Sequence, residues 1–66
     1  MLKVTYEWTT YKVRPGLWLA QVIQLSNGMH DGPVRAVGVE VMRERDAVRA
    51  ARVLLKMYLL EHGLTS

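Results

Sequence analysis

Apolar and polar positions alternate along the chain from Leu2 to Thr9. The even-numbered positions carry apolar or aromatic side chains, and the odd-numbered positions between them carry lysine, threonine and glutamate. Alternation with a period of two, rich in β-branched and aromatic residues, is typical of a strand with one buried face. We predict a strand over about 2–13, with a change of parity in its second half, because Tyr11 and Val13 are odd-numbered.

A second strand is expected after Pro15-Gly16, which has the residue types of a tight turn. Apolar residues occupy both parities over 18–25, which indicates a central strand or one that is covered on both faces. If Val13 lies opposite Trp18, one face of the hairpin is apolar near the turn and the other face is apolar far from it. A β-bulge at Thr9-Thr10 would instead restore a single apolar face, and the sequence fits both arrangements.

The rest of the chain is predicted to form a loop, a third strand and a helix. Residues 26–33 contain two turn dipeptides, Asn27-Gly28 and Gly32-Pro33, and we assign them to a loop longer than a tight turn. Valines alternate with other residues over 34–42, as in a strand, and helix formers without proline or glycine fill 44–62. The predicted fold class is α+β, with one domain spanning the whole chain: a three-stranded antiparallel sheet in β-β-β-α order, packed by one C-terminal amphipathic helix.

The predicted helix has two distinct faces at 100° per residue. One narrow stripe is basic and contains no acidic residue; it consists of Arg45, Arg49, Arg52 and Lys56. The opposite face, which we expect to pack on the sheet, consists of Ala47, Ala50, Ala51, Leu54, Met57 and Tyr58. Val53 and Leu60 lie on one shoulder of the stripe and Leu59 lies on the other, so the apolar surface is wider than one sheet requires. A partner chain that covers a shoulder, or simple exposure of a few apolar side chains, would account for this width.

The composition favours a protein that hides part of its surface in an assembly. Half of the 66 residues are hydrophobic, and cysteine is absent, which removes disulfides and thiolate metal sites. A domain of this size buries too little surface to be robust alone. We therefore expect a homodimer and a protein partner, and the candidate interface residues are Tyr11, Val13, Trp18, Val22, Val53, Leu59 and Leu60.

A formal net charge of +3 permits binding to an acidic macromolecule without requiring it. The basic stripe is either a solvated helix face or a ridge that follows a nucleic-acid backbone. A second candidate surface is the sheet face away from the helix, with its expected cations and aromatics: Lys12, Arg14, Arg35, Tyr11 and Trp18. We favour the competing interpretation, in which these two aromatic side chains are buried in a dimer interface or in the core of the monomer.

No motif indicates catalysis, a cofactor or a metal site. His30 is adjacent to Asp31 and His62 is distant, and two histidines without cysteine lack the spacing of a structural zinc site. No serine or threonine lies in a recognisable nucleophile motif, and the glycines match no phosphate-binding pattern. An enzyme would have to assemble its active site across a dimer interface from His30, Asp31 or Glu40. We expect no enzymatic activity, no cofactor and no metal.

Two stretches carry a resemblance to known families. Gly16–Val22 (GLWLAQV) followed by Asp46–Ala51 (DAVRAA) resembles the arm-type DNA-binding domain of phage integrases, in which a three-stranded sheet precedes one helix and enters the DNA groove. The same order of elements resembles the fold of HicB-type antitoxins, whose chains dimerise and bind a toxin. The chain lacks the dense basic residues of the former on its second and third strands, and the glycine- and cysteine-containing core of the latter. No site residue is therefore carried over from either family.

No apolar run approaches the roughly 20 residues that span a bilayer, and no signal-peptide pattern is visible at the N-terminus. We expect a cytoplasmic protein without membrane contact. The function that the sequence favours is that of a small non-enzymatic interaction protein, of the kind found in phages and mobile elements, that self-associates and binds a macromolecular partner. The alternative is a nucleic-acid-binding protein that uses the basic stripe or the sheet face.

Overall fold

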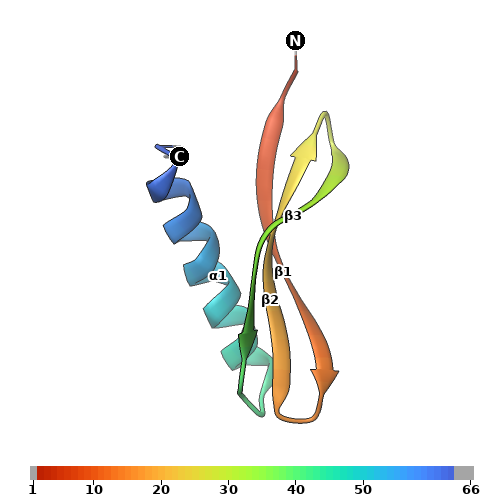
Figure 1. The fold of residues 1–66 in the computed structure, drawn as a ribbon, viewed down its shortest axis with the longest axis vertical. Coiled ribbons are helices and arrows are strands. Elements are labelled where there is room, and N and C mark those ends of the chain that lie inside the picture. The colour runs from red at the N-terminus through yellow and green to blue at the C-terminus, as the bar shows by residue number, and fades with distance from the viewer. Residues whose placement is uncertain (1, 64–66) are drawn as a thin grey trace.

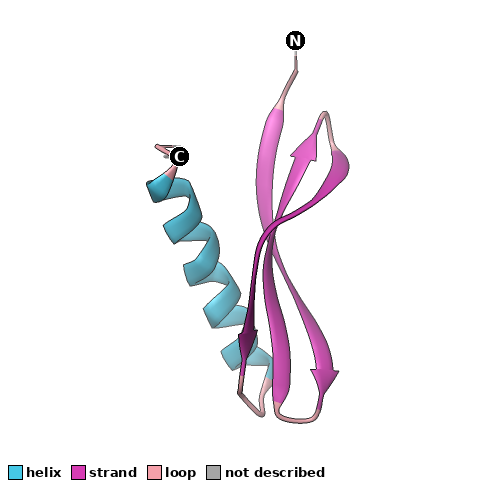
Figure 2. Ribbon diagram, viewed as in Figure 1, coloured by secondary structure: helices cyan, strands magenta, loops and turns pink. Residues whose placement is uncertain are grey.

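The fold is an open antiparallel sheet of three strands followed by one helix (Figure 1). It was obtained as a computed structural model, which describes residues 2–63. The strands β1 (Val4–Arg14), β2 (Leu17–Ser26) and β3 (Met29–Val39) lie side by side in chain order, and α1 (Glu44–Glu61) returns along the sheet (Figure 2). The predicted α+β class and the predicted order of elements are confirmed.

The first hairpin has a register that differs from the predicted one. Lys12, and not Val13, lies opposite Trp18, and the pairing is continuous from Val4 to Lys12 without a bulge at Thr9-Thr10. The irregularity lies beside the turn instead, because Arg14 pairs with Leu17 and leaves Val13 as an extra residue in β1. The proposed register therefore holds only next to the turn, and both explanations of the parity change are wrong.

The second hairpin closes through a turn of two residues. Asn27 and Gly28 have φ angles of 53° and 82°, the left-handed values that the tightest hairpin turns require. The backbone of Asn27 donates to the Lys3 carbonyl, and its side-chain Oδ1 accepts from the Lys3 amide, so the turn is also tied to the start of β1. The predicted loop over 26–33 is therefore wrong, and β3 begins at Met29.

The extra residues of the predicted loop are absorbed into β3 as irregularities of an edge strand. The β2–β3 register shifts twice, leaving Asp31 and Val34 without a partner on β2. Pro33 lies between them, at an edge position where a missing amide hydrogen is tolerated. The strand also ends earlier than the predicted 34–42, at Val39.

The core lies between α1 and the central strand β2. Among the described residues the buried hydrophobic side chains are Trp18, Ala20, Val22, Ile23, Leu25, Ala47, Ala51 and Tyr58. Buried residues of both parities in β2 agree with its predicted central position. Ala47 and Ala51 are fully buried, and their small side chains let the helix approach the sheet closely.

The helix lies off the centre of the sheet. It packs mainly against β2 and β1 and contacts β3 little. Ala47, Ala51 and Tyr58 were correctly predicted to face the sheet, but Met57 is 51% exposed. Met57 lies to the β3 side of the buried helix face, where no strand is close enough to cover it. The molecule is elongated, with dimensions of 42 × 22 × 15 Å, because its long axis follows strands of 10 and 11 residues.

Candidate functional site

An apolar groove runs between α1 and β3, where the helix leaves the sheet uncovered. Its volume is about 440 Å³. Val37 on the strand side and Val53 and Met57 on the helix side are 44%, 50% and 51% exposed. The residues that line the groove are Ala20, Val37, Val39, Val41, Asp46, Arg49, Ala50, Val53, Leu54 and Met57.

The floor of the groove is continuous with the hydrophobic core. Val37 pairs with the buried Ala20 across the β2–β3 ladder, and Val39 pairs with the buried Trp18. Cross-strand partners share one face of a sheet, so both valines face the helix side. Leu60 is 59% exposed and follows Val53 by seven residues, which places it along the same side of α1. The exposed apolar side chains of this region therefore form one surface and are not scattered singly.

The predicted interface residues divide into three groups. Trp18 is 7% exposed and Val22 is fully buried within the single chain, so their assignment to an interface is wrong. Val53 and Leu60 belong to the groove region, whereas Leu59 is half-buried on the opposite shoulder of the helix. Tyr11 and Val13 are exposed on β1, an edge strand on the other side of the sheet from β3.

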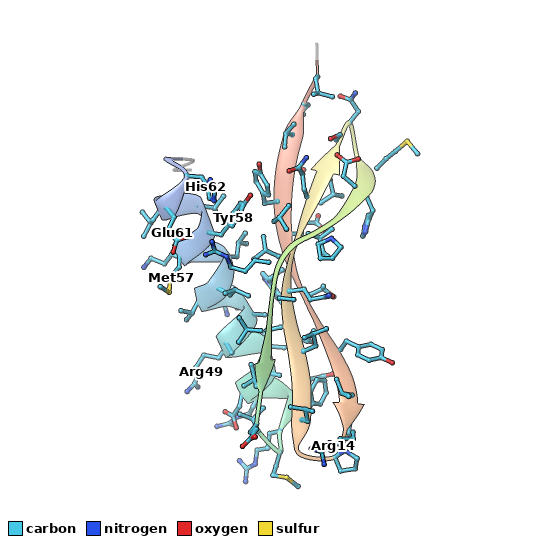
Figure 3. All side chains as sticks on the ribbon, viewed as in Figure 1. Arg14, Arg49, Met57, Tyr58, Glu61 and His62 are labelled. Atoms are coloured by element: carbon cyan, nitrogen blue, oxygen red, sulfur yellow. The ribbon has the colours of Figure 1, made fainter. Side chains whose placement is uncertain are left out.

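The basic stripe forms a ridge along the outer side of α1. Arg45, Arg49, Arg52 and Lys56 are all exposed. Arg49 points away from the sheet in Figure 3. Within residues 2–63 the one ion pair joins Arg35 to Glu61, so no carboxylate neutralises a ridge cation through a salt bridge.

The three cations that were predicted to share one face of the sheet do not form a common basic surface. Arg35 lies opposite Val22, four residues along β2 from the partner of Lys12, which is a separation of about 13 Å. The Arg35 guanidinium is 2.7 Å from the Glu61 carboxylate and 5.2 Å from the centre of the Tyr58 ring. Arg35 therefore holds the end of α1 to β3 and is not a free basic residue. Sequence periodicity gave no sign of this contact, because the two residues are far apart in the chain.

The two candidate aromatics lie on opposite faces of the sheet. Lys12 and Trp18 are cross-strand partners, with the Lys12 ammonium 6.0 Å from the Trp18 ring, whereas Tyr11 pairs with Leu19 on the other face. Trp18 is buried on the helix side. The favoured interpretation, burial, is confirmed for Trp18 in the core, whereas Tyr11 is 62% exposed. The alternative of one aromatic surface away from the helix is wrong, because the register differs by one residue and a shift of one exchanges the faces.

A cluster of aromatic and polar side chains that the sequence analysis missed closes the far end of the groove. The Tyr58 ring lies 4.3 Å from that of His62 (Figure 3). It also lies 5.2 Å from the Tyr6 ring, and the Arg35 guanidinium of β3 lies over it. Burial raises the pKa of Tyr6, and the charge and the hydrogen bond of Tyr58 raise it further. These contacts tie β1, β3 and α1 together, which is a structural role.

The other polar residues of the described chain have structural positions and do not gather into a metal-binding cluster. Across residues 2–63 no three histidine, cysteine or carboxylate side chains come close enough to hold a metal ion. His30 is exposed in β3, while His62 stacks on Tyr58 at the end of the helix. Asp31 accepts hydrogen bonds from Ser26 and Gln24, which pins the irregular part of β3 to β2.

Comparisons with family models, curated proteins and solved structures found no match for this chain. The integrase and antitoxin resemblances therefore gain no support from them. No helix in the described part of the chain has the length and apolar character needed to cross a membrane.

Proposed function

We propose that this protein is a non-enzymatic interaction module that self-associates through the groove and its flanking residues and then binds a second macromolecule. The observation that carries the proposal is the uncovered apolar surface formed by Val37, Val53, Met57 and Leu60. Large contiguous apolar patches are uncommon on monomers and mark interaction sites.

The accessible surface area of the chain is larger than that of a compact monomer of the same mass, which supports an interface of ordinary size. A compact monomer of 7.6 kDa is expected to expose about 4,300 Å². The chain exposes 4905 Å², which is an excess of roughly 600 Å². A standard interface buries about 800 Å² on each partner, so one contact of ordinary size would remove the excess.

A second copy of the chain suits the surface because exposed apolar side chains, Met57 and Leu60, lie beside the groove. A two-fold interface requires one patch to be complementary to itself. The proposed interface places the exposed Met57 and Leu60 of each copy over Val37 in the groove of the other. The edge of β3 between Arg35 and Val39, which contains no proline and no register shift, could extend the same contact by strand pairing.

The test is the molar mass in solution, measured by light scattering and sedimentation equilibrium from low to high micromolar concentration. The wild-type chain should give a mass of about twice the monomer value, and Val53→Glu and Met57→Glu should restore the monomer mass of 7.6 kDa. Val13→Glu is the matched control, because Val13 and Val53 are both 50% exposed but only Val53 lines the groove. A wild-type monomer at every concentration, or dissociation by Val13→Glu alone, would overturn the proposal.

A further inference from the structure

The basic ridge on one side of α1 accounts for the net positive charge of the chain. The net formal charge of the chain is +3, and the four ridge residues alone carry a larger positive charge than this. The rest of the chain is therefore slightly negative in sum. The face that carries the ridge therefore has a positive electrostatic potential that attracts anions. A protein does not need such a one-sided distribution of charge to be soluble.

The charges of the ridge are available to a ligand. Glu44 and Asp46 lie in the first turn, to either side of the ridge, and Glu61 is held by Arg35 at the other end of the helix. All four ridge side chains are exposed. The helix backbone beneath them is fixed on the sheet by the buried Ala47 and Ala51. A ligand would therefore meet a preorganised row of cations.

The spacing of the ridge suits a regular polyanion. The helix rises about 17 Å between Arg45 and Lys56, at about 1.5 Å per residue. This length corresponds to about five base pairs of duplex at about 3.4 Å each. Three of the four cations are arginine, whose planar guanidinium can contact two phosphate oxygens at once.

An anionic membrane is a poorer match for the same surface. A helix that lies on a membrane buries its apolar face among the lipids. Here that face is occupied by the sheet, and its central residues Ala47, Ala51 and Tyr58 are buried. The exposed apolar side chains of α1, Val53, Met57 and Leu60, lie beside the groove, whereas the ridge itself presents only cations. The ridge therefore favours an electrostatic contact with a phosphate backbone over insertion.

We propose that the ridge of Arg45, Arg49, Arg52 and Lys56 binds the phosphate backbone of duplex nucleic acid without reading its sequence. The site belongs to a single chain. It goes beyond self-association and does not depend on it, so a monomeric protein that binds duplex would sink the previous proposal and leave this one standing.

The experiment is fluorescence anisotropy with a labelled duplex DNA of mixed sequence across a salt series. Four phosphate contacts predict a slope of about −3.6 in log K against log salt, and hence a loss of roughly 150-fold between about 50 and 200 mM salt. The ridge variant Arg49→Gln, Arg52→Gln, Lys56→Gln should flatten this slope to about −1.

The matched control is Lys3→Gln, Lys12→Gln, Arg14→Gln, which removes the same charge from exposed positions outside the helix. It should keep the slope of the wild-type protein. The single variant Arg52→Gln, at an exposed ridge position that does not line the groove, should lower the slope by about one.

Three results would overturn the proposal. The first is no binding at the lowest salt concentration. The second is an equal loss in both triple variants, which would reduce the effect to net charge. The third is tighter binding to phosphatidylserine vesicles or to polyglutamate than to the duplex at the same salt concentration, which would assign the ridge to a membrane or to an acidic protein. Helical circular dichroism of each variant confirms that the comparison is made between folded proteins.

Discussion

The off-centre helix makes a quantitative prediction about two valines on the same face of the sheet. Val22 on β2 is fully buried beneath α1, whereas Val37 on β3 is 44% exposed in the groove. Replacing Val22 with alanine deletes two methyl groups, which costs about 1.6 kcal/mol in transfer free energy. With the cavity that remains, the free energy of unfolding should fall by about 2–3 kcal/mol. Val37→Ala should cost less than about 1 kcal/mol in the monomer, because nearly half of that side chain is already in water.

The loss at Val22 is large for a chain of this size, whose total stability is expected to be about 3–10 kcal/mol. Urea unfolding followed by tryptophan fluorescence measures it, since Trp18 is buried in the same core. With a slope of about 1 kcal/mol per molar urea, the midpoint of Val22→Ala should fall by roughly 2–3 M. Equal costs for the two substitutions at low protein concentration would refute the placement of α1 over β2 and β1. If a second copy covers the groove, the cost of Val37→Ala should also grow with protein concentration.

Two further predictions test other contacts. Gly28→Ala should lower the free energy of unfolding by about 1–2 kcal/mol, because a φ of 82° is strained for any residue with a Cβ atom, although the space around Gly28 is open. Urea unfolding measures the loss, and an unchanged midpoint would contradict the two-residue turn. The raised pKa of Tyr6 means that the folded chain keeps this proton when the unfolded chain has lost it, so stability should fall as the pH rises above the ordinary value of 10.0. Tyr6→Phe should make that alkaline decline shallower in pH-dependent thermal unfolding, and an identical decline in both proteins would contradict the assignment.

The elements that depend on local pattern could be predicted from the sequence. The helix over 44–62 was expected from uninterrupted helix formers, and it spans Glu44–Glu61. The apolar residues of both parities in β2 indicated a central strand, because only a strand covered on both sides tolerates them.

The features that depend on single residues were not predictable in the same way. A single extra residue, Val13, changed the register of the first hairpin and thereby moved Tyr11 and Trp18 to opposite faces. The Asn27-Gly28 turn had a usable signal, since this dipeptide favours the tightest hairpin turn, but the nearby Gly32-Pro33 suggested a longer loop. The edge strand accommodates both of those residues through register shifts, which no pattern of hydrophobicity encodes.

The candidate site was only partly visible in the sequence. The ridge follows from helical periodicity, and the structure leaves all four of its cations exposed. The groove does not follow from periodicity, because it depends on where the helix lies across the sheet. Arg35 illustrates the same limit: its ion pair with Glu61 joins positions whose proximity is set only by the packing of α1 against the strands.

The order of the strands in the sheet has a consequence for how quickly the chain folds. Each strand pairs only with its neighbour in sequence, and two-residue turns close both hairpins. Loop closure in the search for the native state therefore involves short segments, and the longest closure is the one that brings α1 back onto β1. The strands are long, however, and the pair at the open end of the first hairpin, Val4 and Ser26, is separated by 26 − 4 = 22 residues. The contact order is therefore that of a β protein and not that of a helical bundle, which predicts slower folding than the short turns alone would suggest. Each hairpin should therefore close from its turn outward, and the open ends of the strands, where the separation in sequence is largest, should pair last.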